Sequence, residues 1–211
     1  PVGALLFTGT AGSGKSATMA AVLADLHDRN RQAARIYCVE DPPEGLLPAS
    51  ATKLAVRRTG PYDENPVERT IAQAMRSDPD ILVIGEIRNE ASAKGILRAA
   101  HSGIRVMTAV FSTPNGALER LDDFIPNRKA HWDKVVHGWV ATRLLPVLCP
   151  HCSIPDTEQG ARRRGEGCKH CRMIGYVGRQ LTAGIWEVVN GKPVLTFSQL
   201  DQAKSLIARG M

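Results

Sequence analysis

The chain has 211 residues, 43% of them hydrophobic and 5% aromatic, and a formal net charge of +6. This is enough for one substantial core and a small additional module. No apolar stretch approaches the roughly eighteen residues that cross a bilayer, and no secretory signal begins the chain, so neither a transmembrane helix nor secretion is predicted. The charge permits an acidic lipid surface or nucleic acid as a partner, although a solvated basic face explains it more simply, and the few aromatic residues offer little for base stacking.

A phosphate-binding loop is the first motif along the chain. Residues 9–16 fill every position of the pattern G-x-x-x-x-G-K-[ST], between an apolar run at 4–7 that predicts a strand and a run at 17–27 that predicts a helix. The glycines let backbone N–H groups turn toward one anion, and the helix directs its positive end to the same point. We expect Lys15 to reach the outer phosphates of a nucleoside triphosphate and Ser16 to ligate Mg²⁺; the alternative is a glycine-rich turn without a ligand. The residues expected to bind the nucleotide are Gly9, Thr10, Ala11, Gly12, Ser13, Gly14, Lys15, Ser16 and Ala17.

Strands and helices then alternate. We predict strands at 35–39, 81–84 and 104–110, and helices at 66–76 and 90–100. Alternation of this kind predicts an α/β fold, with a mainly parallel sheet and helices on both faces. Within the first of these strands, Cys38 is expected to be a buried core thiol.

Acidic residues end two of these strands. Glu40 and Asp41 precede Pro42 and Pro43, which stop the strand, and Glu86 follows the strand at 81–84. Ligands of parallel sheets bind beyond the carboxyl ends of the strands, so these acids are expected beside the phosphate loop. There one carboxylate can hold Mg²⁺ through water and another can orient or deprotonate the attacking water. Each acid alone could equally be a solvated strand end.

Four of the five cysteines form one pattern, C-x₂-C-x₁₅-C-x₂-C. This spacing is typical of a structural zinc site made by two thiolate knuckles, here Cys149 with Cys152 and Cys168 with Cys171. Two disulfides are the main alternative, which is disfavoured in an ATP-using cytosolic protein. The histidines inside the knuckles, His151 and His170, are alternative ligands.

Three segments, residues 40–44, 78–88 and 148–152, resemble the secretion ATPases that drive type II secretion and type IV pilus assembly. The resemblance runs from Pro1 to about Val189. The second segment places Gly-Glu where ordinary phosphate-loop enzymes carry Asp. The four cysteines, followed by residues 175–179, are similar to the assembly or secretion branch of the family.

The resemblance implies an ATP-hydrolysing RecA-like motor core at residues 1–145, a zinc module at 146–180, and a C-terminal strand and helix at 181–211. It implies a homohexamer in the cytoplasm, peripherally associated with the inner membrane through a platform protein, with ATP, Mg²⁺ and Zn²⁺ as cofactors. Nucleic acid is not expected as a partner. Only three residues precede the first predicted strand, so we expect the family's N-terminal domain to be absent, and a fragment without it to hydrolyse ATP weakly.

The resemblance also implies roles for single residues. Lys15 and Ser16 match the family's phosphate and Mg²⁺ contacts, and Glu40 matches the glutamate assigned to activating water. Glu86 matches the family's Walker B glutamate, near Mg²⁺ and in contact with it through water. Arg88 matches an arginine near the site or the subunit boundary. The candidate catalytic residues are thus Glu40, Glu86 and Lys15, and the sequence leaves open which glutamate is the base.

One departure concerns a histidine that the family keeps in the strand after Walker B. Counting back from Arg120 without gaps places Val110 at that position. Coupling to the nucleotide state is therefore open, and Thr108, Ser112 or Thr113 are candidates for part of the role.

Three other functions are compatible with parts of the sequence. A DNA-translocating or conjugation-associated RecA-like motor would suit the zinc module and the arginine run at 162–164. That run has no aromatic neighbour, so a solvated stretch is the simpler interpretation. A nucleotide kinase would need a second substrate site or a lid, which the sequence does not indicate. An inactive ATPase fold carrying a structural zinc module is the third alternative.

Overall fold

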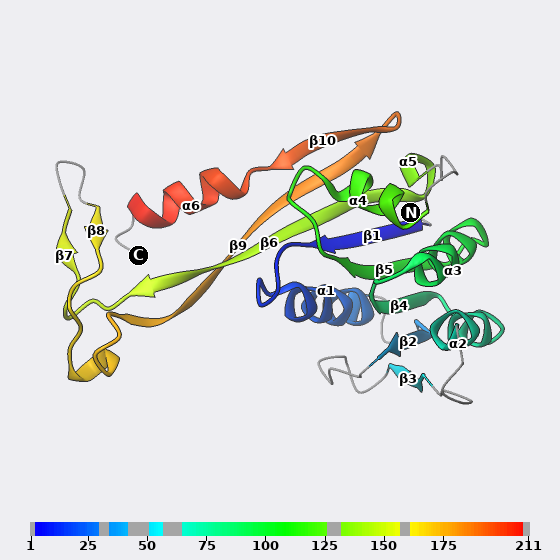
Figure 1. Cartoon of the computed structure of the whole chain (residues 1–211), viewed down its shortest axis with the longest axis horizontal. Coiled ribbons are helices and arrows are strands. Elements are labelled where there is room, and N and C mark those ends of the chain that lie inside the picture. The colour runs from blue at the N-terminus through cyan, green and yellow to red at the C-terminus, as the bar shows by residue number, and fades with distance from the viewer. Residues whose placement is uncertain are drawn as a thin grey trace.

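A computed structural model describes residues 3–29, 34–41, 51–56, 65–125, 132–156 and 161–208 (Figure 1). Pro42 and Pro43, which we expect to end a strand, lie outside the described residues. The elements are β1 (Gly3–Thr8), α1 (Lys15–Arg29), β2 (Ile36–Glu40), β3 (Thr52–Ala55), α2 (Pro66–Met75), β4 (Ile81–Glu86), α3 (Glu90–His101), β5 (Arg105–Val110), α4 (Ala117–Phe124), α5 (Trp132–Val135), β6 (Val136–Leu148), β7 (Ile154–Pro155), β8 (Arg162–Arg163), the 3₁₀ turn η1 (Lys169–Cys171), β9 (Tyr176–Val189), β10 (Lys192–Phe197) and α6 (Gln199–Ala208).

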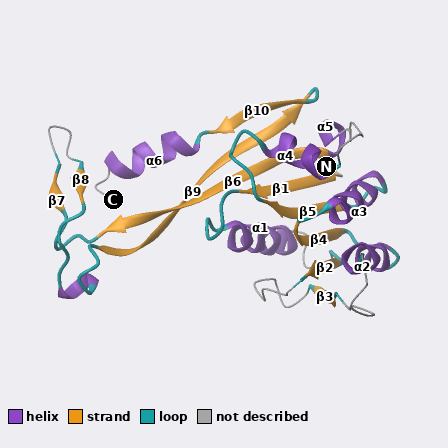
Figure 2. Cartoon of the chain, in the orientation of Figure 1, coloured by secondary structure: helices purple, strands orange, loops and turns teal. Residues whose placement is uncertain are grey.

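One eight-stranded sheet organises the chain, in the order β10-β9-β6-β1-β5-β4-β2-β3 (Figure 2). Six consecutive strands of this order, β6-β1-β5-β4-β2-β3, pair with one another in parallel. At the other edge, β9 pairs antiparallel with β6, and β10 pairs antiparallel with β9. The predicted α/β fold with a mostly parallel sheet is therefore confirmed. Strands β2, β4 and β5 and helices α2 and α3 lie within one or two residues of their predicted bounds.

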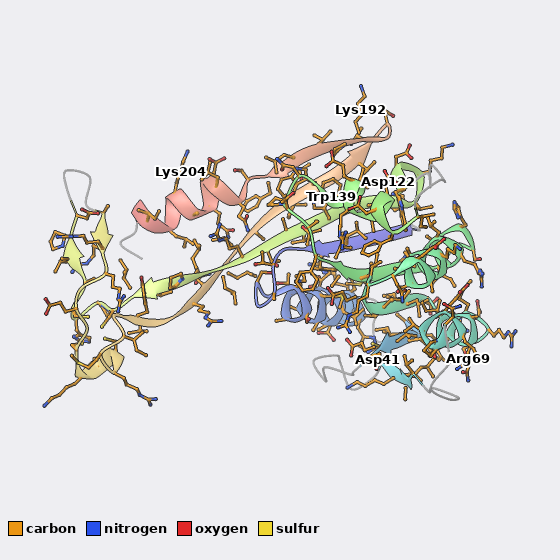
Figure 3. All side chains as sticks on the ribbon, in the orientation of Figure 1. Asp41, Arg69, Asp122, Trp139, Lys192 and Lys204 are labelled. Carbon is orange, nitrogen blue, oxygen red and sulfur yellow. The ribbon has the colours of Figure 1, made fainter. Side chains whose placement is uncertain are left out.

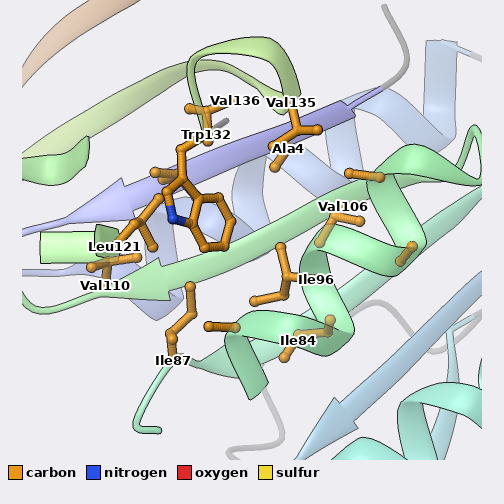
Figure 4. Close-up of a cluster of buried hydrophobic side chains, with 14 of the residues drawn as sticks. Ala4, Ile84, Ile87, Ile96, Val106, Val110, Leu121, Trp132, Val135 and Val136 are labelled. Carbon is orange, nitrogen blue, oxygen red and sulfur yellow. The ribbon is translucent and has the colours of Figure 1, made fainter. Parts of the chain in front are cut away.

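Helices cover both faces of the parallel strands. On one face, Met19 and Leu23 of α1 pack against Phe7 and Met107. On the other, α2 to α5 bury a larger cluster that includes Ile96 and Trp132 (Figure 4). Because the central strands are buried on both faces, their sequences are continuous apolar runs, which made them recognisable in the sequence. Cys38 is buried in the α1 cluster, as predicted, and burial raises the pKa of its thiol.

A long antiparallel ribbon extends from this body. Strands β6 and β9 pair from Gly138 opposite Glu187 to Leu148 opposite Tyr176. Their far end carries the cysteine knuckles, well away from helices α1 to α5 (Figure 1). The expected domain boundaries at 145 and 180 fall inside these two strands, which run without interruption between the sheet and the cysteine module. After β9 the chain forms β10 and then α6. None of the helices in the described ranges is both long enough and apolar enough to cross a membrane.

Candidate functional site

A cavity of about 790 Å³ lies beside the phosphate loop, at the carboxyl ends of the parallel strands. Its lining includes the loop and the first turns of α1 (residues 11–17) as well as Glu40, Asp41, Glu86 and Arg88. Loop and acids thus come from three different segments of the sequence and meet at one edge of the sheet. This is the edge at which ligands of open α/β sheets bind.

The amino group of Lys15 is held inside this cavity. Its Nζ atom donates to the carbonyl oxygens of Gly9 at 2.9 Å and Thr10 at 2.8 Å. The side chain is buried, at 8% exposure. Lys15 is the first residue of α1, so the same loop that holds the lysine also presents the positive end of a fifteen-residue helix. The arrangement can receive an anionic phosphate.

A residue far along the sequence supports the loop. The hydroxyl groups of Ser13 and Thr142 lie 3.1 Å apart, and the Thr142 hydroxyl donates to the carbonyl of Thr8 at 3.3 Å. Thr142 belongs to β6, which pairs with β1 directly before the loop. Sequence reasoning missed Thr142, because no local pattern links residues so far apart.

Glu40 and Gly85 show why the Gly-Glu pair suits this strand end. Strands β2 and β4 are parallel neighbours with Val39 opposite Ile84, so Glu40 lies beside Gly85. A Cβ atom at position 85 would lie 3.2 Å from the Cγ atom of Glu40. The missing side chain therefore leaves room for the side chain of Glu40, a buried residue with 8% exposure.

Glu86 has one carboxylate oxygen paired and one unpaired. Its Oε2 atom accepts from Nε of Arg88 at 3.2 Å, and Nη1 of Arg88 also donates to the carbonyl of Asp41 at 3.3 Å. The Oε1 atom is buried and has no hydrogen-bond partner among the described residues. A buried, unpartnered carboxylate oxygen is costly unless a donor or cation meets it. Glu86 lines the cavity beside the phosphate loop, so its carboxylate fits a hydrated Mg²⁺.

The residue after β5 that faces the cavity is Phe111. The ring lines the cavity, and the Lys15 Nζ atom lies 3.9 Å from its centroid. Val110 is fully buried on the opposite face, in the cluster with Leu121 and Trp132 (Figure 4). Among the described residues, the cavity lining includes Phe111 but not Val110, the position counted to match the family's histidine. It also lacks Thr108, Ser112 and Thr113, the candidates for part of that role. Val110, which the count back from Arg120 placed at the histidine position, is therefore a core residue.

The four predicted knuckle cysteines come together at the end of the ribbon. Their Sγ atoms all lie within 4.8 Å of one another, with the pairs 149–168 and 152–171 at 3.8 Å and the pair 168–171 at 3.9 Å. Sulfurs placed tetrahedrally about 2.3 Å from a zinc ion are separated by about 3.8 Å. All five cysteines of the chain are free thiols here, which argues against the disulfide alternative. The cluster can hold a metal ion.

The environment of the cluster favours thiolates unevenly. Burial disfavours the Cys171 thiolate, but the N–H groups of Cys168 and Gly175 donate to its Sγ at 3.2 and 3.1 Å and bring its pKa from 9.0 down to about 6. Burial and the neighbouring sulfurs raise the pKa of Cys152 to about 12. His151 and His170 are not part of the sulfur cluster, and their rings contact each other at a tilt of 56°, with centroids 4.3 Å apart.

Two of the three arginines at 162–164 make contacts within the module. Arg162 donates to the hydroxyl and the carbonyl of Ser153, and Arg164 donates to the carbonyl of Ile174 at 3.0 Å.

Asp80, in one of the segments that resemble the family, lies at the start of β4, the opposite end of that strand from Glu86. It accepts from the backbone N–H of Arg35 at 2.8 Å. These side chains have structural contacts that the sequence pattern did not reveal.

Fold and loop together define a phosphate-loop nucleotide-binding protein of the mixed α/β class. More narrowly, the chain belongs to the family described as type II/IV secretion system protein, whose profile matches residues 1–203. It is 32% identical over 204 residues to the type II secretion system protein E of Pseudomonas aeruginosa, covering 90% of this chain and 38% of that protein. It is 31% identical over 198 residues to the type IV pilus assembly ATPase PilB of Thermus thermophilus, covering 85% of this chain and 21% of PilB.

Solved structures agree on the fold. The ATPase DotB of Legionella pneumophila superposes with a TM-score of 0.62 at 16% identity, over 90% of this chain and 46% of DotB. The pilus retraction motor PilT with bound ADP superposes with a TM-score of 0.59 at 22% identity, over 100% of this chain and 55% of PilT. The chain spans less than half the length of these two curated relatives.

Proposed function

We propose that the chain is the motor core of an ATP-hydrolysing subunit that powers type II secretion or type IV pilus assembly. The observation that carries the proposal is the convergence of Lys15, Glu40 and Glu86 on one cavity. Membership of the secretion family and the names of the relatives support the biological process.

In this proposal the phosphate loop and α1 hold the phosphates, through the backbone N–H groups of residues 9–17 and the amino group of Lys15. Mg²⁺, when bound at Ser16 and near Glu86, would neutralise charge on the outer phosphates. One of the two glutamates, Glu40 or Glu86, orients the attacking water and accepts its proton. Arg88 holds one oxygen of the Glu86 carboxylate and leaves the second without a hydrogen-bond partner among the described residues.

The cysteine cluster is proposed to hold one structural Zn²⁺. Four thiolates complete a tetrahedron and leave no open position for water, so the ion would stabilise the module and take no part in hydrolysis. The ribbon places the cluster away from the nucleotide cavity, in keeping with this division (Figure 1).

For the whole protein we propose a homohexamer that works in the cytoplasm at the inner membrane, docked on a platform protein of the secretion or pilus machine. A further domain would complete each nucleotide site in the ring, so the motor core alone should hydrolyse ATP weakly. The curated relatives, which are much longer than the aligned region, support this expectation.

The test is ATP binding and turnover by the full-length protein with and without Lys15→Ala. Loss of the only loop cation should lower turnover at least about a hundredfold, because that charge meets the phosphates in the transition state. Lys53→Ala, an exposed lysine of β3, is the matched control and should be neutral. Unchanged turnover in Lys15→Ala would refute the proposed site.

A further inference from the structure

We propose that the outer tip of the cysteine module docks on an anionic lipid surface. The tip consists of Lys169, Arg172, Met173 and Ile174, on and directly after the 3₁₀ turn η1. This inference rests on the membrane association proposed above and names the part of the chain that makes the contact.

Two large apolar side chains project from the tip. Met173 is 63% exposed and Ile174 is 54% exposed, and they are consecutive in the sequence. Isolated apolar residues on a surface need no explanation, but adjacent ones with this exposure at the end of an extended ribbon indicate a contact surface. Figures 1 and 2 place the turn at the end of the molecule remote from the helices that cover the sheet.

The backbone holds this pair in place. Arg172 and Met173 have φ angles of 53° and 64°, in the left-handed region that non-glycine residues rarely adopt. The N–H of Met173 donates to the carbonyl of Cys168 at 2.9 Å and that of Ile174 to the carbonyl of Cys171 at 3.1 Å. Two successive residues with these uncommon backbone angles, hydrogen-bonded to the second cysteine knuckle, hold the apolar side chains in defined positions.

Gly167 makes this turn possible. A Cβ atom at Gly167 would lie 2.6 Å from the backbone carbonyl of Met173, and the residue has a φ angle of 110°. Only glycine allows the second knuckle to fold back this closely beneath the turn. The position of Met173 is therefore built into the sequence of the module.

Cations accompany the apolar pair. Lys169 and Arg172 are exposed on the same turn, and the guanidinium of Arg164 is bound to the carbonyl of Ile174. Residues 149–179 contain six Lys and Arg against three Asp and Glu. The four sulfurs form one cluster, and a bound metal would partly offset the charge of their thiolates. The tip therefore combines exposed cations with exposed apolar side chains.

This combination favours a lipid surface over other acidic partners. Anionic headgroups attract the cations, and the apolar side chains enter the boundary between headgroups and acyl chains. Nucleic acid would meet the same cations but would gain little from Met173 and Ile174. Tyr176, the single aromatic residue of residues 149–179 other than the histidines, lies 5.5 Å from the Arg164 guanidinium.

The test is flotation of the full chain with vesicles of phosphatidylglycerol and phosphatidylcholine in equal parts, compared with vesicles of phosphatidylcholine alone. We expect binding to the anionic vesicles only, weakened by salt. Met173→Ser combined with Ile174→Ser should reduce binding about tenfold, and Lys169→Glu combined with Arg172→Glu should reduce it as strongly.

Matched controls are available on α6 and β10. Leu200→Ser with Ile207→Ser removes apolar side chains that are 63% and 49% exposed, and Lys192→Glu with Lys204→Glu reverses two exposed lysines (Figure 3). Both controls should bind vesicles as the unaltered chain does. Metal content and nucleotide affinity, measured on every variant, should stay unchanged, so that a failure of this inference is distinguishable from a failure of the proposed motor function.

Three results would overturn the inference. The unaltered chain could fail to bind anionic vesicles, or the tip variants could bind them as well as the controls do. Alternatively, the tip variants could lose affinity for a DNA duplex while vesicle binding is absent, which would assign the tip to nucleic acid.

Discussion

The amino group of Lys15 lies over the ring of Phe111, with 3.9 Å between Nζ and the ring centroid. The same amino group donates to two carbonyls of its own loop. For Lys15 to reach a bound phosphate, its amino group must exchange these partners for phosphate oxygens. Phe111 has no polar atom to offer a phosphate, unlike the histidine that the related motors were expected to share. The ring therefore acts on the lysine and not directly on the nucleotide.

We expect Phe111→Leu to tighten nucleotide binding about two- to fivefold. Leucine keeps an apolar side chain at the site but lacks the π face, and a partly exposed cation–π contact is worth about 0.5–1 kcal/mol. Equilibrium binding of Mg–ATP checks this. Phe124→Leu, whose ring pairs with Arg120 at 4.5 Å on α4, is the control. Weaker binding in Phe111→Leu would mean that the ring supports the bound state instead.

Glu40→Gln and Glu86→Gln should each keep nucleotide affinity and slow turnover by about a hundredfold or more. The loss falls on the chemical step because an amide neither accepts the proton of water nor holds a metal-bound water as a carboxylate does. Varying the Mg²⁺ concentration separates the roles, since the variant that loses the metal contact should need more Mg²⁺. Glu68→Gln, in an exposed pair with Arg98 at 3.1 Å, should be neutral. Normal turnover in both site variants would place the acids outside the mechanism.

Elemental analysis should find one zinc ion per chain, and none in Cys168→Ser. The serine oxygen cannot replace a thiolate in a tetrahedral zinc site, so the variant should also unfold the module at lower temperature while ATP binding persists. Cys38→Ala provides the control, because this thiol is buried in the α1 cluster far along the chain from the knuckles. Zinc retained by Cys168→Ser, or lost from Cys38→Ala, would contradict the assignment.

Asp80→Asn should lower stability at neutral pH but not in acid. The hydrogen bond from the backbone N–H of Arg35 is the main cause that lowers the pKa of Asp80. Burial opposes it, and the Arg35 side chain adds to the lowering. A carboxyl whose folded-state pKa is depressed stabilises the fold fully above its unfolded pKa of about 3.9, and that contribution disappears as the pH falls through the folded value. Thermal midpoints of both proteins should therefore differ slightly at pH 7 and converge in acid. A constant difference would show that charge is not involved.

Much of the site was predictable because its signals are local. The phosphate loop and the knuckles depend on residue types at fixed short spacings, and the strand tips depend on apolar runs that end in acids. Glu40 and Glu86 could be assigned to the same edge of the sheet because parallel strands in βαβ units share their direction. Family resemblance followed from the same short motifs.

The sequence by itself determined the α/β class, the phosphate loop and the grouping of the four cysteines. Tertiary structure decided that Phe111, and not Val110, faces the lysine, because side chains alternate along a strand and a shift of one residue selects the opposite face. It also decided that Thr142 meets Ser13, across 129 positions of sequence, and that Glu40 lies beside Gly85. Such contacts arise from strand register, and register is set by the packing of the whole sheet rather than by any local run of residues.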